Sequence, residues 1–418
     1  MSKQDGTPLS RRGLLQCMAW AGTGIVWGVR AGVPVSLGLD AMATSAAGGF
    51  TFVQISDSHV GFDKAPNPDA RATYREAVAK IKALPNRPAF ILHTGDISHL
   101  SRDQEFDDAD QIIREAGLPV FHVPGEHDML DEGNGKAYLD RYGQGTLGAG
   151  WHSFDQHGIH FVGLVNVTNL KAGGMGSLGE EQIAWLEKDL RGRSASTPVV
   201  VFTHIPLWVL YAEWGWGTDD GVRALALLRR FGSVTVLNGH IHQVMQKVEG
   251  HIAFHTARST AFPQPAPGTA PSPGPMKVPA EELHKVLGVR TATLLHRNAP
   301  LAIVDSTLES AGVAAAAATA AAVAGTAEKP AAAAADAGRT IKISNFTFEP
   351  VSMDVPVGAS LTWVNEDDIP HTVVADDRSF KSKVLDSGQS FTFTFTAAGK
   401  YGYFCSLHPH MTGTVVVG

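Results

Sequence analysis

The sequence predicts two domains of different fold class, an α/β or α+β layered domain followed by a small all-β domain. Three observations carry this prediction. Between residues 49 and 308, short apolar runs typical of strands alternate with helical stretches. Residues 309–338 are dominated by alanine, and from residue 340 onward apolar side chains alternate strictly with polar ones. A chain of 418 residues with 44% hydrophobic content is long enough for two or three domains with cores of their own.

The first 43 residues have the features of an export signal. Ser10-Arg11-Arg12-Gly13-Leu14-Leu15 is a twin-arginine pattern, and an apolar, glycine-rich segment leads from it to the small-residue site Ala41-Met42-Ala43. Arg30 and Pro34 interrupt this segment, which argues against a membrane anchor. We therefore expect export by the twin-arginine pathway to the periplasm or the outside of the cell, with no membrane span after signal removal.

The net charge and the cysteine content of the chain beyond residue 43 limit the ligands that it can bind. The first 43 residues carry four Lys or Arg and two Asp, so the net charge of -7 becomes -9 without them. A chain this acidic is not expected to bind nucleic acid through bulk charge.

Cys17 lies in the signal, which leaves Cys405 as the one cysteine of the mature chain. Without a partner for an internal disulfide, Cys405 is either reactive or a metal ligand.

Five apolar runs in the first domain end in Asp, Glu or His residues. Because ligands bind beyond the carboxyl ends of sheet strands, these side chains are expected to converge on one metal site. The residues are Asp57 and His59, then Asp96, then Glu126 with His127 and Asp128, then His204, and finally His240 with His242. Hard carboxylate oxygens and imidazoles are the ligands that a pair of divalent ions requires.

Helices are expected at residues 71–84, 104–116 and 179–190, the last opened by a capping box from Ser177 to Glu180. Two irregular segments interrupt the domain. Residues 262–279 are rich in proline, and residues 207–221 are rich in tryptophan. The tryptophan segment is either a flap packed on its own domain or an aromatic wall of a substrate pocket.

The strand ends resemble the motifs of the calcineurin-like metallophosphoesterases, a group with similarity to class III cyclic-nucleotide phosphodiesterases and purple acid phosphatases. The matching segments are Asp57-Ser58-His59, Gly95-Asp96, Gly125-Glu126-His127-Asp128, Thr203-His204 and Gly239-His240-Ile241-His242. The resemblance covers residues 50–260 and implies a four-layer αββα sandwich. It also implies two divalent or mixed-valence metal ions (Fe, Mn or Zn) and the hydrolysis of a phosphomonoester or phosphodiester by a hydroxide held between them.

The resemblance assigns a role to each residue. Asp57, His59, Asp96 and His242 would hold one ion, and Glu126, His204 and His240 the other, with Asp96 bridging. His127 would lie beside the ions and hydrogen-bond the phosphate or protonate the leaving oxygen. Asp128 would orient His127 through its other ring nitrogen, or alternatively would serve as a turn or helix cap.

Glu126 departs from the family pattern, which has asparagine at this position. A ligating glutamate lowers the net charge of the site by one, which at about 4 Å and an effective dielectric near 20 is worth about 4 kcal/mol. Three outcomes are open: one ion is trivalent iron, Glu126 points away, or catalysis is weakened. Ferric purple acid phosphatases have tyrosine where this chain has His99, so His99 is expected to contact a ligand and not the metal.

The alanine-rich residues 309–338 are broken by Lys329-Pro330 and are expected to form a partly helical or disordered linker. Residues 339–418 predict a small all-β sandwich or barrel. At about eighty residues its core alone is marginal, and a bound metal would stabilise it.

His371 and the C-terminal segment from Cys405 to Met411 resemble cupredoxins with the short Cys-x-x-His-x-x-Met loop of amicyanins. The resemblance covers residues 340–418 and implies a cupredoxin sandwich with one type 1 copper ion. The implied ligands are His371, Cys405, His408 and Met411, a soft thiolate with two imidazoles and an axial thioether. His410 is expected to be an exposed ring at the copper end, where a redox partner would deliver electrons.

Two functions are compatible with these features. The favoured one is an exported dinuclear phosphoesterase acting on a small phosphoester, with an accessory blue-copper domain. The alternative is a periplasmic copper-binding or electron-transfer protein whose esterase-like domain is weak or regulatory. Fold-level analogy does not choose between monoester and diester substrates.

Overall fold

The computed structural model describes residues 26–30, 33–37, 50–131, 133–168, 170, 173–294, 301–309, 339–367, 369–408 and 410–418. The twin-arginine pattern and the cleavage site lie outside the described residues, as does the linker from residue 310 to 338. Two short strands, β1 (Val26–Arg30) and β2 (Val33–Leu37), are described within the first 43 residues and pair with each other.

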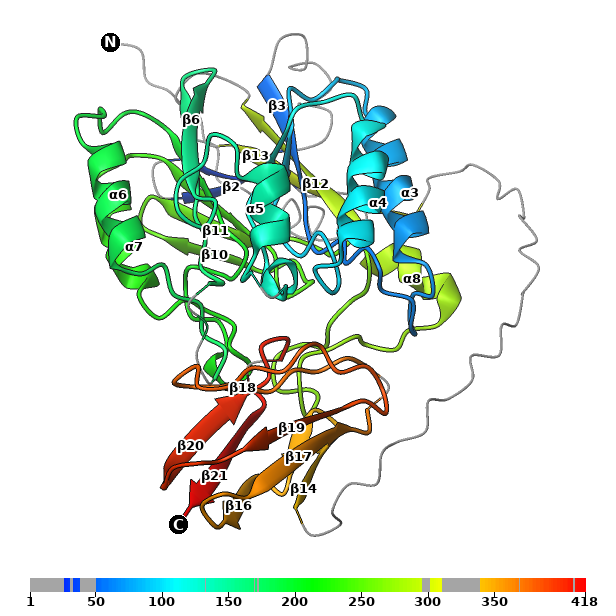
Figure 1. Ribbon diagram of the computed structural model, residues 1–418. Coiled ribbons are helices and arrows are strands. Elements are labelled where there is room, and N and C mark those ends of the chain that lie inside the picture. The colour runs from blue at the N-terminus through cyan, green and yellow to red at the C-terminus, as the bar shows by residue number, and fades with distance from the viewer. Residues whose placement is uncertain are drawn as a thin grey trace, which may run out of the picture.

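Two sheets form the centre of the first domain (Figure 1). The first has the order β2-β1-β13-β12-β3-β4-β5 and the second the order β10-β11-β9-β8-β7-β6. The other strands of the first sheet are β3 (Phe50–Ile55), β4 (Ile91–His93), β5 (Val120–His122), β12 (Gly288–Leu294) and β13 (Ala302–Thr307). The second sheet contains β6 (His152–Gln156), β7 (Ile159–Gly163), β8 (Val199–Phe202), β9 (Val234–Asn238), β10 (Gln246–Glu249) and β11 (Ile252–Thr256).

The strands that lead to the predicted ligands are parallel neighbours. β3, β4 and β5 run parallel in one sheet, and β8 and β9 run parallel in the other. Their carboxyl ends therefore meet at one edge of the domain, as expected from the sequence.

Helices cover the outer face of each sheet, so the domain has four layers in the order α, β, β, α (Figure 1). They are α3 (Ala70–Lys82), α4 (Asp103–Arg114), α5 (Lys136–Tyr142), α6 (Glu180–Leu190), α7 (Gly221–Leu228) and α8 (Ala280–Val286). Strand β3 shows why the layers form: Val53 and Ile55 pack with α3 and α4, whereas Phe52 points into an aromatic core between the sheets. The predicted fold class is confirmed.

The predicted helices are present as α3, α4 and α6. The predicted capping box at α6 is wrong, because Gly179 is the residue that precedes the helix and makes no side-chain cap. The Ser177 hydroxyl instead donates to Asp220 Oδ2 at 3.1 Å. Among the described residues, no helix has the length and apolar character needed to cross a membrane.

The second domain is a sandwich of two four-stranded sheets, ordered β15-β14-β17-β19 and β16-β21-β20-β18. The strands are β14 (Thr340–Ser344), β15 (Thr347–Glu349), β16 (Ser352–Val355), β17 (Ser360–Asn365), β18 (Val374–Ala375), β19 (Ser390–Thr394), β20 (Gly399–Phe404) and β21 (Thr412–Val417). Trp363 is fully buried at its centre, against Tyr403. The β18 end of this domain faces the first domain (Figure 1).

Candidate metal centres

The candidate ligands of the first domain lie on turns that directly follow the strands. Five of them have positive φ angles, which residues with side chains adopt only at a cost: Asp57 (53°), His59 (39°), Asp96 (51°), His240 (71°) and His242 (52°). Glycine is required at one neighbouring position, because a Cβ on Gly125 would overlap Asp96 Oδ1. Such concentrated backbone strain is typical of a functional site.

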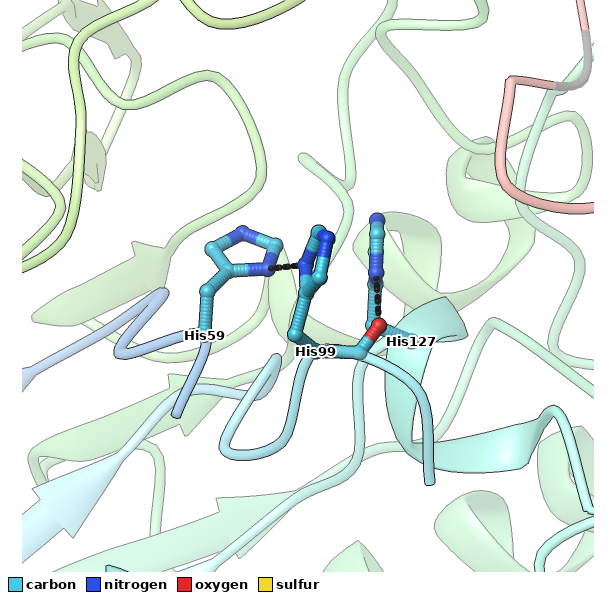
Figure 2. A group of neighbouring side chains, drawn as sticks. All are labelled: His59, His99 and His127. Carbon is cyan, nitrogen blue, oxygen red and sulfur yellow. Dashed lines mark hydrogen bonds between the residues drawn. The ribbon is translucent and has the colours of Figure 1, made fainter. Parts of the chain in front are cut away.

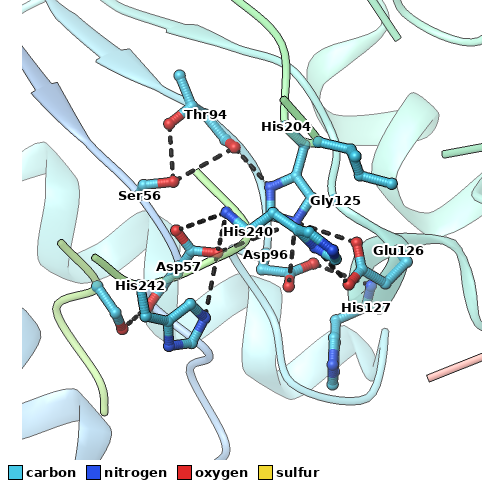
Figure 3. A network of polar contacts seen from close by, with 12 residues as sticks. Ser56, Asp57, Thr94, Asp96, Gly125, Glu126, His127, His204, His240 and His242 are labelled. Atoms are coloured by element: carbon cyan, nitrogen blue, oxygen red, sulfur yellow. Dashed lines mark hydrogen bonds and ion pairs between the residues drawn. The ribbon is translucent and has the colours of Figure 1, made fainter. Parts of the chain in front are cut away.

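All seven predicted ligands converge in one buried cluster. Figure 3 shows six of them, and His59 is drawn in Figure 2. Asp57, His59 and His242 form one group, with His242 Nε2 at 3.3 Å from both His59 Nε2 and Asp57 Oδ1. Glu126, His204 and His240 form a second group. Glu126 Oε2 is 3.0 Å from His204 Nε2, and Glu126 Oε1 is 2.9 Å from His240 Nδ1.

Asp96 lies between the two groups. Its Oδ2 atom is 3.5 Å from His59 Nε2 and 3.3 Å from His204 Nε2. Its Oδ1 atom accepts a hydrogen bond from the His127 backbone N–H at 3.0 Å. Asp96 therefore occupies the position that a bridging carboxylate requires.

Backbone carbonyls orient two of the histidine rings. His204 Nδ1 donates to Thr94 O at 2.7 Å (Figure 3), and His242 Nδ1 donates to Phe262 O at 2.6 Å. These bonds place the Nδ1 proton and leave the Nε2 lone pair facing the cluster. Neither carbonyl could be predicted from the sequence, because any residue type can supply one.

The charges in the cluster are strongly coupled. Burial raises the pKa of Asp96, and the charge of Glu126 raises it further. Burial opposes ionisation of Glu126, but His240 and His204 hold its pKa well below the ordinary value. Burial lowers the pKa of His204, yet Asp96 and Glu126 outweigh burial and raise it. A cation at this position would therefore compete with the proton that these carboxylates favour on His204.

The donor set fits metal ions. Three carboxylates and four imidazoles lie in a space shielded from water, where carboxylates repel one another unless a cation separates them. His204 Nε2 and Glu126 Oε2 are buried, and their 3.0 Å contact lacks hydrogen-bond geometry. Atoms aimed at each other in this way are typical of ligands that share an ion.

Two further histidines lie beside His59 (Figure 2). His99 Nδ1 lies 3.4 Å from His59 Nδ1, whereas His59 Nε2 is the ring atom that faces His242 and Asp96, so His99 contacts a candidate ligand as expected. The His127 ring stacks on His99 with centroids 5.0 Å apart, and its Nδ1 donates to His99 O at 2.6 Å. His127 Nε2 is therefore the ring atom that can act on a substrate.

The prediction that Asp128 orients His127 is wrong. The Asp128 carboxylate instead accepts hydrogen bonds from the backbone N–H groups of Ile97, Ser98 and Gly125, at 2.8 to 3.1 Å, and from the Ser98 hydroxyl at 2.9 Å. The alternative reading, a residue that ties a turn, is the one that the structure supports. Asp128 joins the turn that follows Asp96 to the turn that contains Glu126.

Replacing Asp128 with asparagine is expected to lower the free energy of unfolding by about 2 kcal/mol, because several donors lose a charged acceptor. His127 keeps its carbonyl partner, so the pH dependence of turnover should not change. Urea unfolding and a pH–rate profile measure the two effects, with exposed Asp140→Asn as the matched control. Unchanged stability together with a shifted pH profile would restore the orienting role.

The second domain places three predicted copper ligands in a triangle. Cys405 Sγ lies 3.7 Å from His371 Nδ1 and 3.7 Å from His408 Nδ1, and the two Nδ1 atoms are 3.2 Å apart. Met411 is buried in the same apolar cluster as Cys405, and its backbone N–H donates to His408 O at 2.8 Å. The loop from Cys405 to Met411 therefore folds around one point.

Neighbouring residues orient the His371 ring and favour the thiolate form of Cys405, which suits a soft cation. His371 Nε2 bonds Asp367 Oδ2 at 2.8 Å, which leaves its Nδ1 facing Cys405. Burial raises the pKa of the Cys405 thiol, but the His371 ring and the Thr372 N–H hold it below its ordinary value. A thiolate with two imidazoles fits copper, and the thioether of Met411, buried in the same cluster, would be the fourth donor.

Comparison with known proteins agrees with both centres. Residues 50–244 match the calcineurin-like phosphoesterase family, and residues 315–417 match the cupredoxin-like domain. The chain is 26% identical over 225 residues to the probable glycerophosphodiester phosphodiesterase GpdQ of Arcobacter nitrofigilis, covering 50% of this chain and 77% of that protein. It is 37% identical over 97 residues to amicyanin of Paracoccus denitrificans, covering 22% of this chain and 74% of that protein. The chain is a calcineurin-like phosphoesterase that carries an amicyanin-like cupredoxin domain.

A solved structure also matches the cupredoxin domain. The purple cupredoxin from Nitrosopumilus maritimus is 32% identical, with 19% of this chain and 99% of that chain covered and a TM-score of 0.19.

A second relative is described as a glycerophosphodiester phosphodiesterase. This GpdQ, from Enterobacter lignolyticus, is 28% identical over 182 residues, which is 42% of this chain and 64% of that protein.

In the phosphoesterase domain, one of the three outcomes for Glu126 is excluded. Its carboxylate does not point away, since both oxygens contact candidate ligands. The tryptophan segment contributes both to the core of its own domain and to the lining of a pocket. Trp208 packs in the core beside α7, whereas Trp214 and Trp216 line the pocket above the cluster.

The expectation that His410 is an exposed ring is wrong. Both of its ring nitrogens are buried, and the ring lines the same pocket as His127. Sequence reasoning missed this placement because nothing in an alanine-rich linker indicates where the domain beyond it docks.

Proposed function

We propose that the phosphoesterase domain hydrolyses a phosphodiester of a small alcohol such as glycerol. The observation that carries the proposal is the pair of ligand groups joined by Asp96 Oδ2. The diester class is supported by the two relatives described as glycerophosphodiester phosphodiesterases. A phosphomonoester presents the same phosphoryl group and is the other substrate class that this site would accept.

Each residue has a proposed part. Asp57, His59 and His242 would hold one ion, Glu126, His204 and His240 the other, and Asp96 both. When bound, the two ions, divalent or of mixed valence, supply Lewis acidity and a water molecule of lowered pKa. His127 contacts the substrate through Nε2, since its Nδ1 is bonded to His99 O. Burial lowers the pKa of His127 to about 4, so the resting ring is neutral with its one proton on Nδ1, and Nε2 must take up a proton before it can donate to the phosphate or to the leaving oxygen.

A substrate panel tests this proposal. Full-length protein loaded separately with iron, manganese or zinc is assayed with bis(p-nitrophenyl) phosphate, p-nitrophenyl phosphate and a glycerophosphodiester. Faster turnover of the diesters than of the monoester is expected. No turnover of any of the three with any of these metals would contradict the proposal.

Replacing Glu126 with asparagine is expected to make the site more positive and to strengthen inhibition by inorganic phosphate at least tenfold, given about 4 kcal/mol per charge at this range. The proportions of iron, manganese and zinc retained should also change. Metal analysis and phosphate inhibition constants measure both effects, with exposed Glu187→Gln as control. Unchanged metal identity with unchanged rates would show that Glu126 is not a ligand.

Two further proposals rest on single features. The three copper ligands in their triangle support an electron-transfer role for the cupredoxin domain. A reversible copper redox couple in protein that lacks phosphoesterase turnover would favour that role as the main one.

The twin-arginine pattern supports export to the periplasm or beyond. Unaltered export after Arg11→Lys and Arg12→Lys would argue against that pathway.

A further inference from the structure

The pocket above the dinuclear cluster is built from both domains. It has an empty volume of about 620 Å³, part of it open to solvent. Its floor contains Asp96, Glu126 and His127 of the phosphoesterase domain. Its outer wall contains Ile369, Pro370, Leu407, His408 and His410 of the cupredoxin domain. These wall residues come from the two loops that carry the copper ligands, so the copper end of one domain faces the catalytic end of the other.

The two domains are packed together at this wall. Leu100 and Leu130, which follow the turns carrying His99 and Glu126, are buried in one apolar cluster with cupredoxin residues. Arg378 of the cupredoxin domain donates to Leu170 O at 2.8 Å, and Lys381 donates to Asn134 Oδ1 at 3.0 Å. The wall is therefore held by direct contacts, in addition to the covalent linker.

One polar group on this wall has no partner. Both ring nitrogens of His410 are buried without a hydrogen bond among the described residues. Phe346 stacks on the His410 ring at 6.5 Å and also packs against Gly274, where an added Cβ would lie 2.8 Å from Phe346 Cζ. The rings nearest His410 are thus those of Phe346 and His408. A hydroxyl group in the pocket, met by a small rotation of the His410 side chain, would satisfy a buried nitrogen that is otherwise unpaired.

We propose that the copper-ligand loops form the subsite for the alcohol part of the substrate, with His410 hydrogen-bonding a hydroxyl of that alcohol. This inference rests on the proposed phosphodiesterase function. The phosphoryl group would lie over Asp96 and His127, which directs one ester group outward, toward Leu407 and His410. His410 is thereby a specificity-determining residue contributed by the cupredoxin domain, and a bound diester lies next to the copper site.

The test compares two diesters that share a phosphoryl group, glycerol methyl phosphate and dimethyl phosphate. Full-length protein with copper and the dinuclear ions bound is assayed for KM and kcat, and the visible copper–thiolate absorption is recorded with each ester. His410→Ala is expected to raise KM for the glycerol ester about tenfold, as for loss of one hydrogen bond, and to leave KM for dimethyl phosphate and both kcat values within about twofold. His410→Gln should restore most of the loss, and the exposed His251→Ala should have no effect.

The wild-type copper absorption is expected to shift at saturating glycerol ester and to shift less with dimethyl phosphate. An equal KM change for both esters, or none, would overturn the inference while leaving the phosphodiesterase function intact. If the wild-type protein turns over neither ester but its copper absorption still shifts with the glycerol ester, the proposed phosphodiesterase function is contradicted. The alcohol subsite on the copper-ligand loops is then still supported. A copper absorption that no ester moves would overturn the inference whether or not turnover occurs.

Discussion

Replacing Asp96 with alanine is expected to reduce phosphoester turnover roughly a thousandfold or more, because both ligand groups depend on this one carboxylate. Asp96 Oδ2 lies within 3.5 Å of His59 and His204, one from each group. Its loss removes the shared negative charge that would allow two cations to lie close together. Measurement of kcat/KM and of metal ions per chain records both consequences.

The same experiment has internal controls. Asp140→Ala, on the exposed face of α5, should keep full turnover and full metal content. Copper binding should be retained in Asp96→Ala, since the copper ligands belong to another domain. Two ions per chain and wild-type turnover in Asp96→Ala would show that Asp96 does not bridge.

Replacing Cys405 with serine is expected to abolish the visible copper–thiolate absorption and to weaken copper binding by roughly a hundredfold or more. This loss exceeds the one expected when a residue that only hydrogen-bonds a metal ligand is removed. The triangle of His371, Cys405 and His408 has a single sulfur, and no other cysteine of the described residues can replace it. Copper titration and absorption spectroscopy measure the loss.

Ser360→Ala, at the exposed first residue of β17, is the control for the Cys405 substitution and should keep the spectrum unchanged. The dinuclear ions should also be retained in Cys405→Ser, because their ligands lie in the phosphoesterase domain. A surviving thiolate band in Cys405→Ser would mean that the copper ligands are assigned incorrectly.

The ligand clusters could be predicted because they depend on local signals. Each candidate ligand of the phosphoesterase follows a strand, and parallel strands bring their ends together whatever the loops do. The copper loop is more local still, with Cys405, His408 and Met411 inside seven residues. Strand order predicted that the phosphoesterase ligands converge, whereas their division between two ions and the copper ligand set were implied by the resemblance to the two families.

The contacts of Asp128 and His410 were not predictable in this way. A carboxylate beside a histidine suggests an orienting pair, but Asp128 is surrounded by the unpaired N–H groups of two turns, and their geometry is absent from the sequence. The sequence predicted a surface ring for His410, but the ring lies in a pocket lined by both domains, beside Phe346 and His408. The docking that forms this pocket, with Leu100 and Leu130 in the cupredoxin core cluster, has no local signal in the sequence.

Anomalous X-ray diffraction from crystals of the metal-loaded full-length chain would locate the ions directly. We expect two peaks on either side of Asp96 Oδ2, roughly 3.5 to 4 Å apart, with Glu126 bound to one of them. A third peak is expected inside the triangle of His371, Cys405 and His408. A single peak beside Asp96, or two peaks both beyond the reach of Glu126 and His204, would contradict a dinuclear phosphoesterase site.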